Sequence, residues 1–239
     1  NLFKMKTLNS ISRSRKFIYS FLIMLLASYS ASAQWTQVGY MVVNGTDTAN
    51  GSHVITGFGA NVYCGTVKGL FKSTDNGSNW ANISFNAAVI SGQDIFSVYQ
   101  ASNGSLFAGS NKRMFKSTDN GTTWSWMSGL PDSATYYDIT EIGGNILATF
   151  AKGTTNGVYY SNDFGATWTQ ATGIASGVRY FLIEGSTVLV GGTSNGIYKS
   201  IDVGQTWSSF GTGFPAAPGI WDIKRSENKL FACSITWLG

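Results

Sequence analysis

Short apolar runs of four or five residues recur along the chain at nearly regular intervals, separated by turns of Gly, Asn and Ser. In one kind of run every position is apolar or small, which is typical of a strand covered on both faces. Its five copies are residues 62–65, 106–109, 146–149, 188–191 and 230–233. No long stretch carries apolar residues at helical spacing, so the chain is predicted to be all-β.

Three other kinds of strand accompany these runs. A first strand comes before the small apolar run and is joined to it by a short turn, at residues 95–99, 138–142, 180–183 and 221–223. A run that alternates apolar and polar residues follows it, at residues 70–73, 114–117, 158–161 and 197–200. A fourth strand begins at a tryptophan shortly afterwards. The chain is therefore predicted to repeat a four-stranded antiparallel unit.

The motif Ser-x-Asp-x-Gly-x-x-Trp occurs four times, and successive copies begin 44, 44 and 39 residues apart. The motif residues are Ser73, Asp75, Gly77, Trp80, Ser117, Asp119, Gly121, Trp124, Ser161, Asp163, Gly165, Trp168, Ser200, Asp202, Gly204 and Trp207. A period of this length, with one tight turn and one aromatic residue per unit, predicts a β-propeller. In that fold, small sheets stand around an axis and each packs against its neighbours.

The chemistry of the motif indicates a structural role. An aspartate at a turn accepts backbone N–H groups two residues on, glycine supplies a positive φ, and tryptophan buries a large face. A calcium ion needs about six to eight oxygen ligands, which one carboxylate on each separate sheet edge cannot provide. No metal and no cofactor are expected.

The repeated motif resembles the Asp-box, or BNR, repeat of sialidases, sortilin-type receptors, plant-cell-wall glucanases and photosystem II assembly factors. The resemblance covers most of residues 34–239 and implies a β-propeller fold. It says little about function, because these proteins are enzymes, receptors and assembly factors that share one architecture.

The two ends of the repeat region suggest an incomplete ring. Residues 34–39 copy the outer-strand sequence at residues 168–173, and the fifth unit shows two strands before residue 239. We therefore expect about four and a half blades, as a fragment of a ring of about six to eight that is incomplete at the C-terminus. A complete ring of about five blades is the alternative.

Residues 1–33 differ from the rest. They hold Lys4, Lys6, Arg13, Arg15 and Lys16 without an acid, then an apolar run at 17–27 and Ala-Ser-Ala at 31–33. This pattern is typical of a secretory signal peptide, with a retained anchor as the alternative. The propeller at residues 34–239 is then secreted, periplasmic or on the cell surface.

The leader also accounts for the basic charge of the chain. Five of the sixteen Lys and Arg residues lie in it, which leaves eleven cations against twelve acids. We expect no nucleic-acid partner, and no membrane insertion once the signal is cleaved.

The few cysteine and histidine residues indicate no redox or metal chemistry. Cys64 and Cys233 fall on equivalent strands four units apart, too far for a disulfide in a ring of about six or more blades. Both are expected to be small buried side chains. His53 is the only histidine, so it cannot form a multi-histidine metal site.

Binding residues are predicted on one face of the propeller. Alternation of strand direction places the long connections between units and the turns after the small apolar strands on the same face, and such loops commonly bind ligands. The candidates on this loop-rich face are Arg113, Tyr136, Tyr137, Arg179, Phe214 and Trp221.

The sequence shows no complete catalytic site. A sialidase-type site needs three converging arginines, but Arg225 is predicted on the face opposite Arg113 and Arg179. A glycosidase needs two facing carboxylates, for which Asp94 and Asp138 are a hypothesis. No catalytic residue is assigned.

The function favoured by the sequence is a secreted, non-catalytic propeller that serves as a binding module or scaffold for protein or glycan. One alternative is a glycoside hydrolase of sialidase or glucanase type whose catalytic residues lie beyond residue 239. A second is an assembly or stability factor that binds a partner protein.

Overall fold

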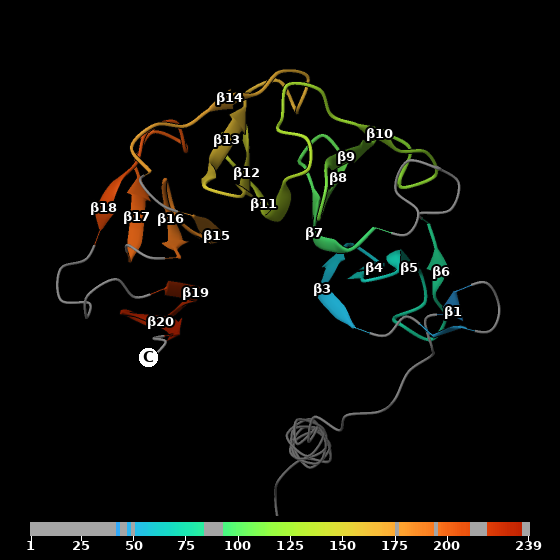
Figure 1. Ribbon diagram of the computed structural model, residues 1–239. Coiled ribbons are helices and arrows are strands. Elements are labelled where there is room, and N and C mark those ends of the chain that lie inside the picture. The colour runs from blue at the N-terminus through green and yellow to red at the C-terminus, as the bar shows by residue number, and fades with distance from the viewer. Residues whose placement is uncertain are drawn as a thin grey trace, which may run out of the picture. The chain divides into compact units, whose positions relative to one another are not determined.

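The computed structural model describes residues 42–43, 47–48, 51–83, 93–174, 177–193, 196–210 and 219–235. The chain divides into two units, residues 1–37 and 38–239, and all described residues belong to the second. They form antiparallel sheets and no helix (Figure 1). The predicted signal peptide and the predicted outer strand at residues 34–39 lie outside the described residues.

Four of the sheets have four strands each, in chain order. The first contains β3 (Ser52–Phe58), β4 (Asn61–Thr66), β5 (Gly69–Ser73) and β6 (Ala81–Asn82), and the second contains β7 (Ile95–Gln100), β8 (Leu106–Ser110), β9 (Met114–Ser117) and β10 (Ser125–Trp126). The third contains β11 (Thr135–Ile142), β12 (Asn145–Lys152), β13 (Thr155–Ser161) and β14 (Thr169–Gln170), and the fourth contains β15 (Val178–Glu184), β16 (Thr187–Gly192), β17 (Ile197–Ser200) and β18 (Ser208–Phe210).

Two smaller sheets complete the described architecture. One pairs β19 (Gly219–Ser226) with β20 (Lys229–Ile235), and the other pairs β1 (Val42–Val43) with β2 (Asp47–Thr48). The prediction of four-stranded antiparallel units is confirmed, as is the start of a fifth unit. The outer strands are only two or three residues long, which leaves little free edge for pairing with another chain.

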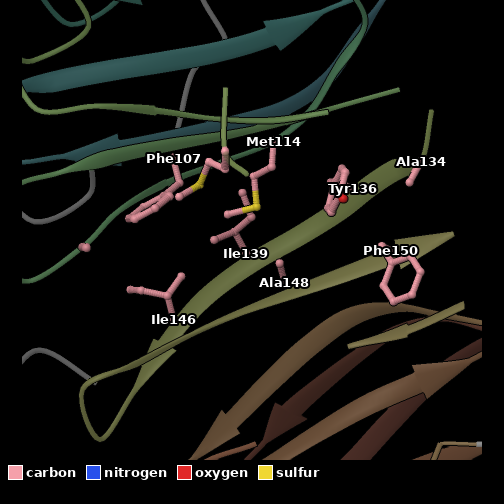
Figure 2. Close-up of a cluster of buried hydrophobic side chains, with 10 residues drawn as sticks. Phe107, Met114, Ala134, Tyr136, Ile139, Ile146, Ala148 and Phe150 are labelled. Atoms are coloured by element: carbon pink, nitrogen blue, oxygen red, sulfur yellow. The ribbon is translucent and has the colours of Figure 1, made fainter. Parts of the chain in front are cut away.

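The core lies mainly between successive sheets. One cluster of buried side chains joins Phe107 and Met114 of the second sheet to Tyr136, Ile139 and Phe150 of the third, as Figure 2 shows. Another joins the first and second sheets through Tyr63, Leu70, Ile95 and Trp124, among others. Each sheet therefore buries a face against its neighbour, as expected of propeller blades.

Close approach between sheets depends on small residues in the second strand of each sheet. In three of the sheets this residue is a glycine. A Cβ atom added to it would lie 3.0 Å or less from a carbonyl oxygen in the first strand of the next sheet: Gly65 against Ile95, Gly109 against Tyr136 and Gly191 against Ile220. In the third sheet Thr149 occupies the corresponding position, and its hydroxyl donates to the carbonyl of Arg179 at 2.7 Å. The backbones of neighbouring sheets are therefore in direct contact.

The Ser-x-Asp-x-Gly-x-x-Trp motifs form four turns with the same hydrogen bonds. In the second sheet, Ser117 donates to Asp119 Oδ1 at 2.7 Å and accepts the N–H of Gly121 at 2.8 Å. Asp119 accepts the N–H of Thr123 at 2.8 Å and its hydroxyl at 2.5 Å. The main backbone donor is thus four residues after the aspartate, and not two as predicted. Ser117 and the carboxylate of Asp119 together close the turn.

Hydrogen bonds lower the pKa of the motif carboxylates. Bonds from Thr123 and Ser117 lower the pKa of Asp119 to about 2, and bonds from Thr167 and Ser161 do the same for Asp163. A carboxylate with a lowered pKa in the folded protein stabilises the fold above its unfolded pKa, near 4, and loses this contribution as the pH falls through its folded pKa.

We therefore expect the melting temperature to fall between about pH 4 and pH 2, measured by circular dichroism at constant ionic strength. The double variant Asp119→Asn/Asp163→Asn should show a shallower decline, because two of the titrating groups are gone. An unchanged decline in that variant would contradict the assignment of acid sensitivity to these turns.

The two cysteines differ in their environments. Both are free thiols, as predicted, and Cys64 is buried. Cys233 is exposed, so the prediction of a buried side chain is wrong for this residue. The physical reason is its position on β20, which has one neighbouring strand among the described residues.

Candidate functional site

The first strand of each sheet carries a β-bulge near its beginning. These first strands are β3, β7, β11, β15 and β19. The regular pairing of each with the second strand of its sheet is interrupted between Ser52 and Val54, Ile95 and Ser97, Tyr136 and Ile139, Val178 and Phe181, and Ile220 and Asp222. A bulge turns a side chain out of the regular alternation of the strand, and bulges are common next to binding sites.

The first bulged residues of the five strands stack on one another. They are His53, Phe96, Tyr137, Arg179 and Trp221. His53 stacks on Phe96 with ring centroids 4.2 Å apart, and Phe96 meets Tyr137 edge-on at 5.6 Å. The guanidinium carbon of Arg179 lies 4.2 Å from the ring centroid of Tyr137 and 4.3 Å from that of Trp221. We call these five side chains the inner ladder.

Arg179 is held in the ladder mainly by the two aromatic faces. Its Nε is buried and has no hydrogen-bond partner. A guanidinium between two rings gains cation–π attraction on both sides, and its planar shape suits stacking. The arrangement fixes the orientation of Tyr137 and Trp221 relative to each other.

A cavity of about 390 Å³ lies beside the ladder. It is lined by His53 from β3, Tyr180 from β15, and Trp221, Asp222 and Lys224 from β19. Lys224 Nζ lies 3.0 Å from Asp222 Oδ1, which also accepts the N–H of Ile223 at 2.9 Å. A small concave space with aromatic and polar walls is the usual form of a ligand site.

The turns on this side of the sheets are tied to the starts of the inner strands. The N–H of Asn111 donates to the carbonyl of Asp94 at 3.1 Å, and the N–H of Ala134 to that of Lys112 at 3.2 Å. Arg113 pairs with Asp132, with Nε 3.0 Å from Oδ1, and its guanidinium covers the ring of Trp126 at 4.1 Å. The ladder, the cavity and these turns share one end of the sheets, which is the predicted loop-rich face.

The acids proposed as a catalytic pair have separate partners. Asp94 faces His53, with Oδ2 4.0 Å from Nε2. The carboxylate of Asp138 accepts the N–H of Ile139 at 2.9 Å and that of Phe181 in the next sheet at 2.8 Å. Burial raises the pKa of Asp138 to about 7, against the opposing effect of these two bonds. Asp138 therefore connects the third and fourth sheets.

The six predicted binding residues occupy different environments. Tyr137, Arg179 and Trp221 meet in the ladder, while Arg113 lies apart from it with Asp132 and Trp126. Tyr136 is fully buried in the core, where its hydroxyl donates to the carbonyl of Pro131 at 2.8 Å, so its ring faces the packing and not the surface. Phe214 lies outside the described residues.

Sequence reasoning missed several residues of this site. His53 and Phe96 belong to the ladder, and Tyr180, Asp222 and Lys224 line the cavity. What the ladder residues share is their position in the strand. In four of the five inner strands, the ladder residue directly follows a fully buried residue, namely Ile95, Tyr136, Val178 or Ile220.

The arginines do not share a partner. Arg225 is paired with Glu184, whereas Arg113 is paired with Asp132 and Arg179 is stacked between rings. Within the described ranges, no three His, Cys, Asp or Glu side chains gather as metal ligands do. The same part of the chain has no helix with the length and apolar character to cross a membrane.

Comparisons with known proteins give structural similarity alone. The chain matches no family model and no curated protein. Solved structures do resemble it. The structure of an ancestral GH74 enzyme has a TM-score of 0.65 at 20% identity, and the match covers 78% of this chain and 28% of that one. The YCF48 protein bound to D1 peptide has a TM-score of 0.59 at 15% identity, covering 84% and 66%.

The extracellular domain of the one-component system BT4673 of B. thetaiotaomicron has a TM-score of 0.62 at 13% identity, covering 83% of this chain and 28% of that one. The chain therefore spans under a third of the length of the GH74 and BT4673 chains. These neighbours are β-propellers, and together with the repeated sheets they define the chain as part of a β-propeller. At these identities the likeness extends to the fold and not to the activity.

Proposed function

We propose that this protein is an exported, non-catalytic propeller of the Asp-box type that binds a protein or glycan at its loop-rich face. The observation that carries the proposal is the inner ladder, because five successive sheets each place a bulged side chain in one stack beside a cavity. If the ladder served packing alone, the ring at its end would not need to be exposed. Trp221, the last ring of the ladder, is 41% exposed.

Two further observations support binding over catalysis, and a third supports export. Each acid near the cavity has a partner of its own: Asp94 has His53, Asp138 has two backbone N–H groups, and Asp222 has Lys224. The Asp-box carboxylates are occupied by their own turns. Export is supported by the leader at residues 1–33 and agrees with the extracellular location stated for the BT4673 domain.

The test uses the full chain on a printed array of glycans and synthetic peptides, with the Trp221→Ala variant beside it. We expect at least one ligand to bind, and its signal to fall about tenfold in the variant, because a buried aromatic contact is worth about 1.4 kcal/mol or more. Phe210→Ala is the matched control: Phe210 is also exposed and also has a cation over its ring, Lys199 at 5.4 Å, but it lies on the outer strand β18.

Two results would contradict the proposal. One is equal binding by Trp221→Ala and the unchanged protein for every ligand found. The other is release of cleaved products from the glycans that the protein recognises, which would make it an enzyme.

A further inference from the structure

Trp221 is partly exposed at the end of the inner ladder. Its ring has the Arg179 guanidinium on one side at 4.3 Å, and Arg179 is backed by Tyr137 at 4.2 Å. The residue is nevertheless 41% exposed and lines the cavity of about 390 Å³. The ring is thus oriented by the residues behind it, while its exposed part remains available to a ligand.

The polar groups around this ring include both donors and acceptors. Asp222 supplies carboxylate oxygens, Lys224 an ammonium group, Tyr180 a phenol and His53 an imidazole. The side chains of Asp222 and Lys224 are 47% and 73% exposed, so their mutual contact at 3.0 Å leaves other positions open for hydrogen bonds. The formal charges of these two exposed lining residues cancel each other, which favours a ligand without net charge beside them. The Arg179 guanidinium lies behind the ring, between Tyr137 and Trp221.

These features restrict the chemistry of the ligand. A purely apolar molecule would desolvate the carboxylate and ammonium groups without satisfying the hydrogen-bonding positions that their mutual contact leaves open. An anion would meet the carboxylate of Asp222, and a cation would meet the ammonium of Lys224. A neutral saccharide matches all three conditions, because its ring has an apolar C–H face for the indole and hydroxyl groups that both donate and accept.

We propose that this cavity binds a neutral saccharide, with one sugar ring stacked on Trp221 and its hydroxyls hydrogen-bonded to Asp222, Lys224 and His53. The inference rests on the proposed function, for which it names the ligand class and the residues in contact. Arg179 is a positioning residue in this account, since it holds the indole in place from behind.

The test measures binding of cellobiose, maltose and N,N′-diacetylchitobiose to the full chain by isothermal titration calorimetry, at concentrations up to about 20 mM. Digalacturonate serves as the anionic probe. We expect at least one neutral disaccharide to bind, with its dissociation constant raised about tenfold or more in Trp221→Ala and changed less in Trp221→Phe. Phe210→Ala should bind like the unchanged protein.

Arg179→Met gives an independent readout of positioning. The variant keeps the stem of the side chain but loses the planar cation, so the disaccharide should still bind, more weakly than to the unchanged protein and more tightly than to Trp221→Ala. Because Trp221 is partly exposed, melting curves of its variants should stay close to that of the unchanged protein. These curves separate a loss of binding from a loss of fold.

Three outcomes would overturn the inference: no binding of any neutral disaccharide, tighter binding of digalacturonate, or binding that Trp221→Ala leaves intact. If a peptide on the array binds in a Trp221-dependent manner while no saccharide does, the proposed function stands and the saccharide inference fails. If no ligand depends on Trp221, both fail.

Discussion

Replacing Gly109 with alanine is expected to lower the free energy of unfolding by about 3 kcal/mol, because overpacking at a rigid contact is costly. The added Cβ would lie 2.7 Å from the carbonyl oxygen of Tyr136 and 2.8 Å from its Cβ, and it would also meet Ser97 Oγ. Tyr136 belongs to the next sheet, so the backbone of that sheet must move away. Urea denaturation followed by tryptophan fluorescence measures the change.

Gly57→Ala is the matched control for this substitution. Gly57 also lies in a strand, β3, but a Cβ there would come no nearer than 3.8 Å to any atom, at the carbonyl oxygen of Asn61. We expect its stability to change by about 0.5 kcal/mol or less. Equal effects of the two substitutions would contradict the claim that neighbouring sheets touch through their backbones at Gly109.

Replacing Trp124 with alanine should cost about 4 kcal/mol, the usual range for removing a large aromatic side chain from a core. Trp124 is 6% exposed and packs with Tyr63 and Leu70 of the first sheet as well as residues of its own. Its indole N–H donates to the carbonyl of Gly121 at 3.1 Å within the turn of the Ser-x-Asp-x-Gly-x-x-Trp motif. The loss should appear as a lower urea midpoint at an unchanged slope.

Trp126→Ala provides the comparison, two residues further along the same sheet. Trp126 is 50% exposed and its described contact is the Arg113 guanidinium at 4.1 Å, so its removal should cost about 1 kcal/mol or less. A Trp124 effect as small as that of Trp126 would show that the tryptophan of the motif does not support the fold.

The strands and turns could be predicted from sequence because their signals are local. The strands at residues 114–117 and 197–200 have the predicted bounds, and the four Ser-x-Asp-x-Gly-x-x-Trp turns lie where the motif places them. Apolar alternation and a repeated turn are sufficient for such elements, since each forms within a few residues of its own sequence.

The inner ladder could not be predicted in the same way. Its members are histidine, phenylalanine, tyrosine, arginine and tryptophan, so no residue type repeats at this position from unit to unit. The neighbours Tyr136 and Tyr137 illustrate the difficulty. Sequence reasoning grouped them as one surface, but Tyr136 is buried between sheets while Tyr137 lies in the ladder, because the bulge begins between them.

A single nuclear magnetic resonance spectrum tests the ladder most directly. Residues 34–239 contain three arginines, and the Nε–H signal of Arg179 reports whether its guanidinium lies between two aromatic rings. We predict an upfield-shifted signal for Arg179 that moves toward the free-arginine position in Trp221→Leu and stays in place in Trp126→Leu. An Arg179 signal at the free-arginine position in the unchanged protein would contradict the ladder and the site built on it.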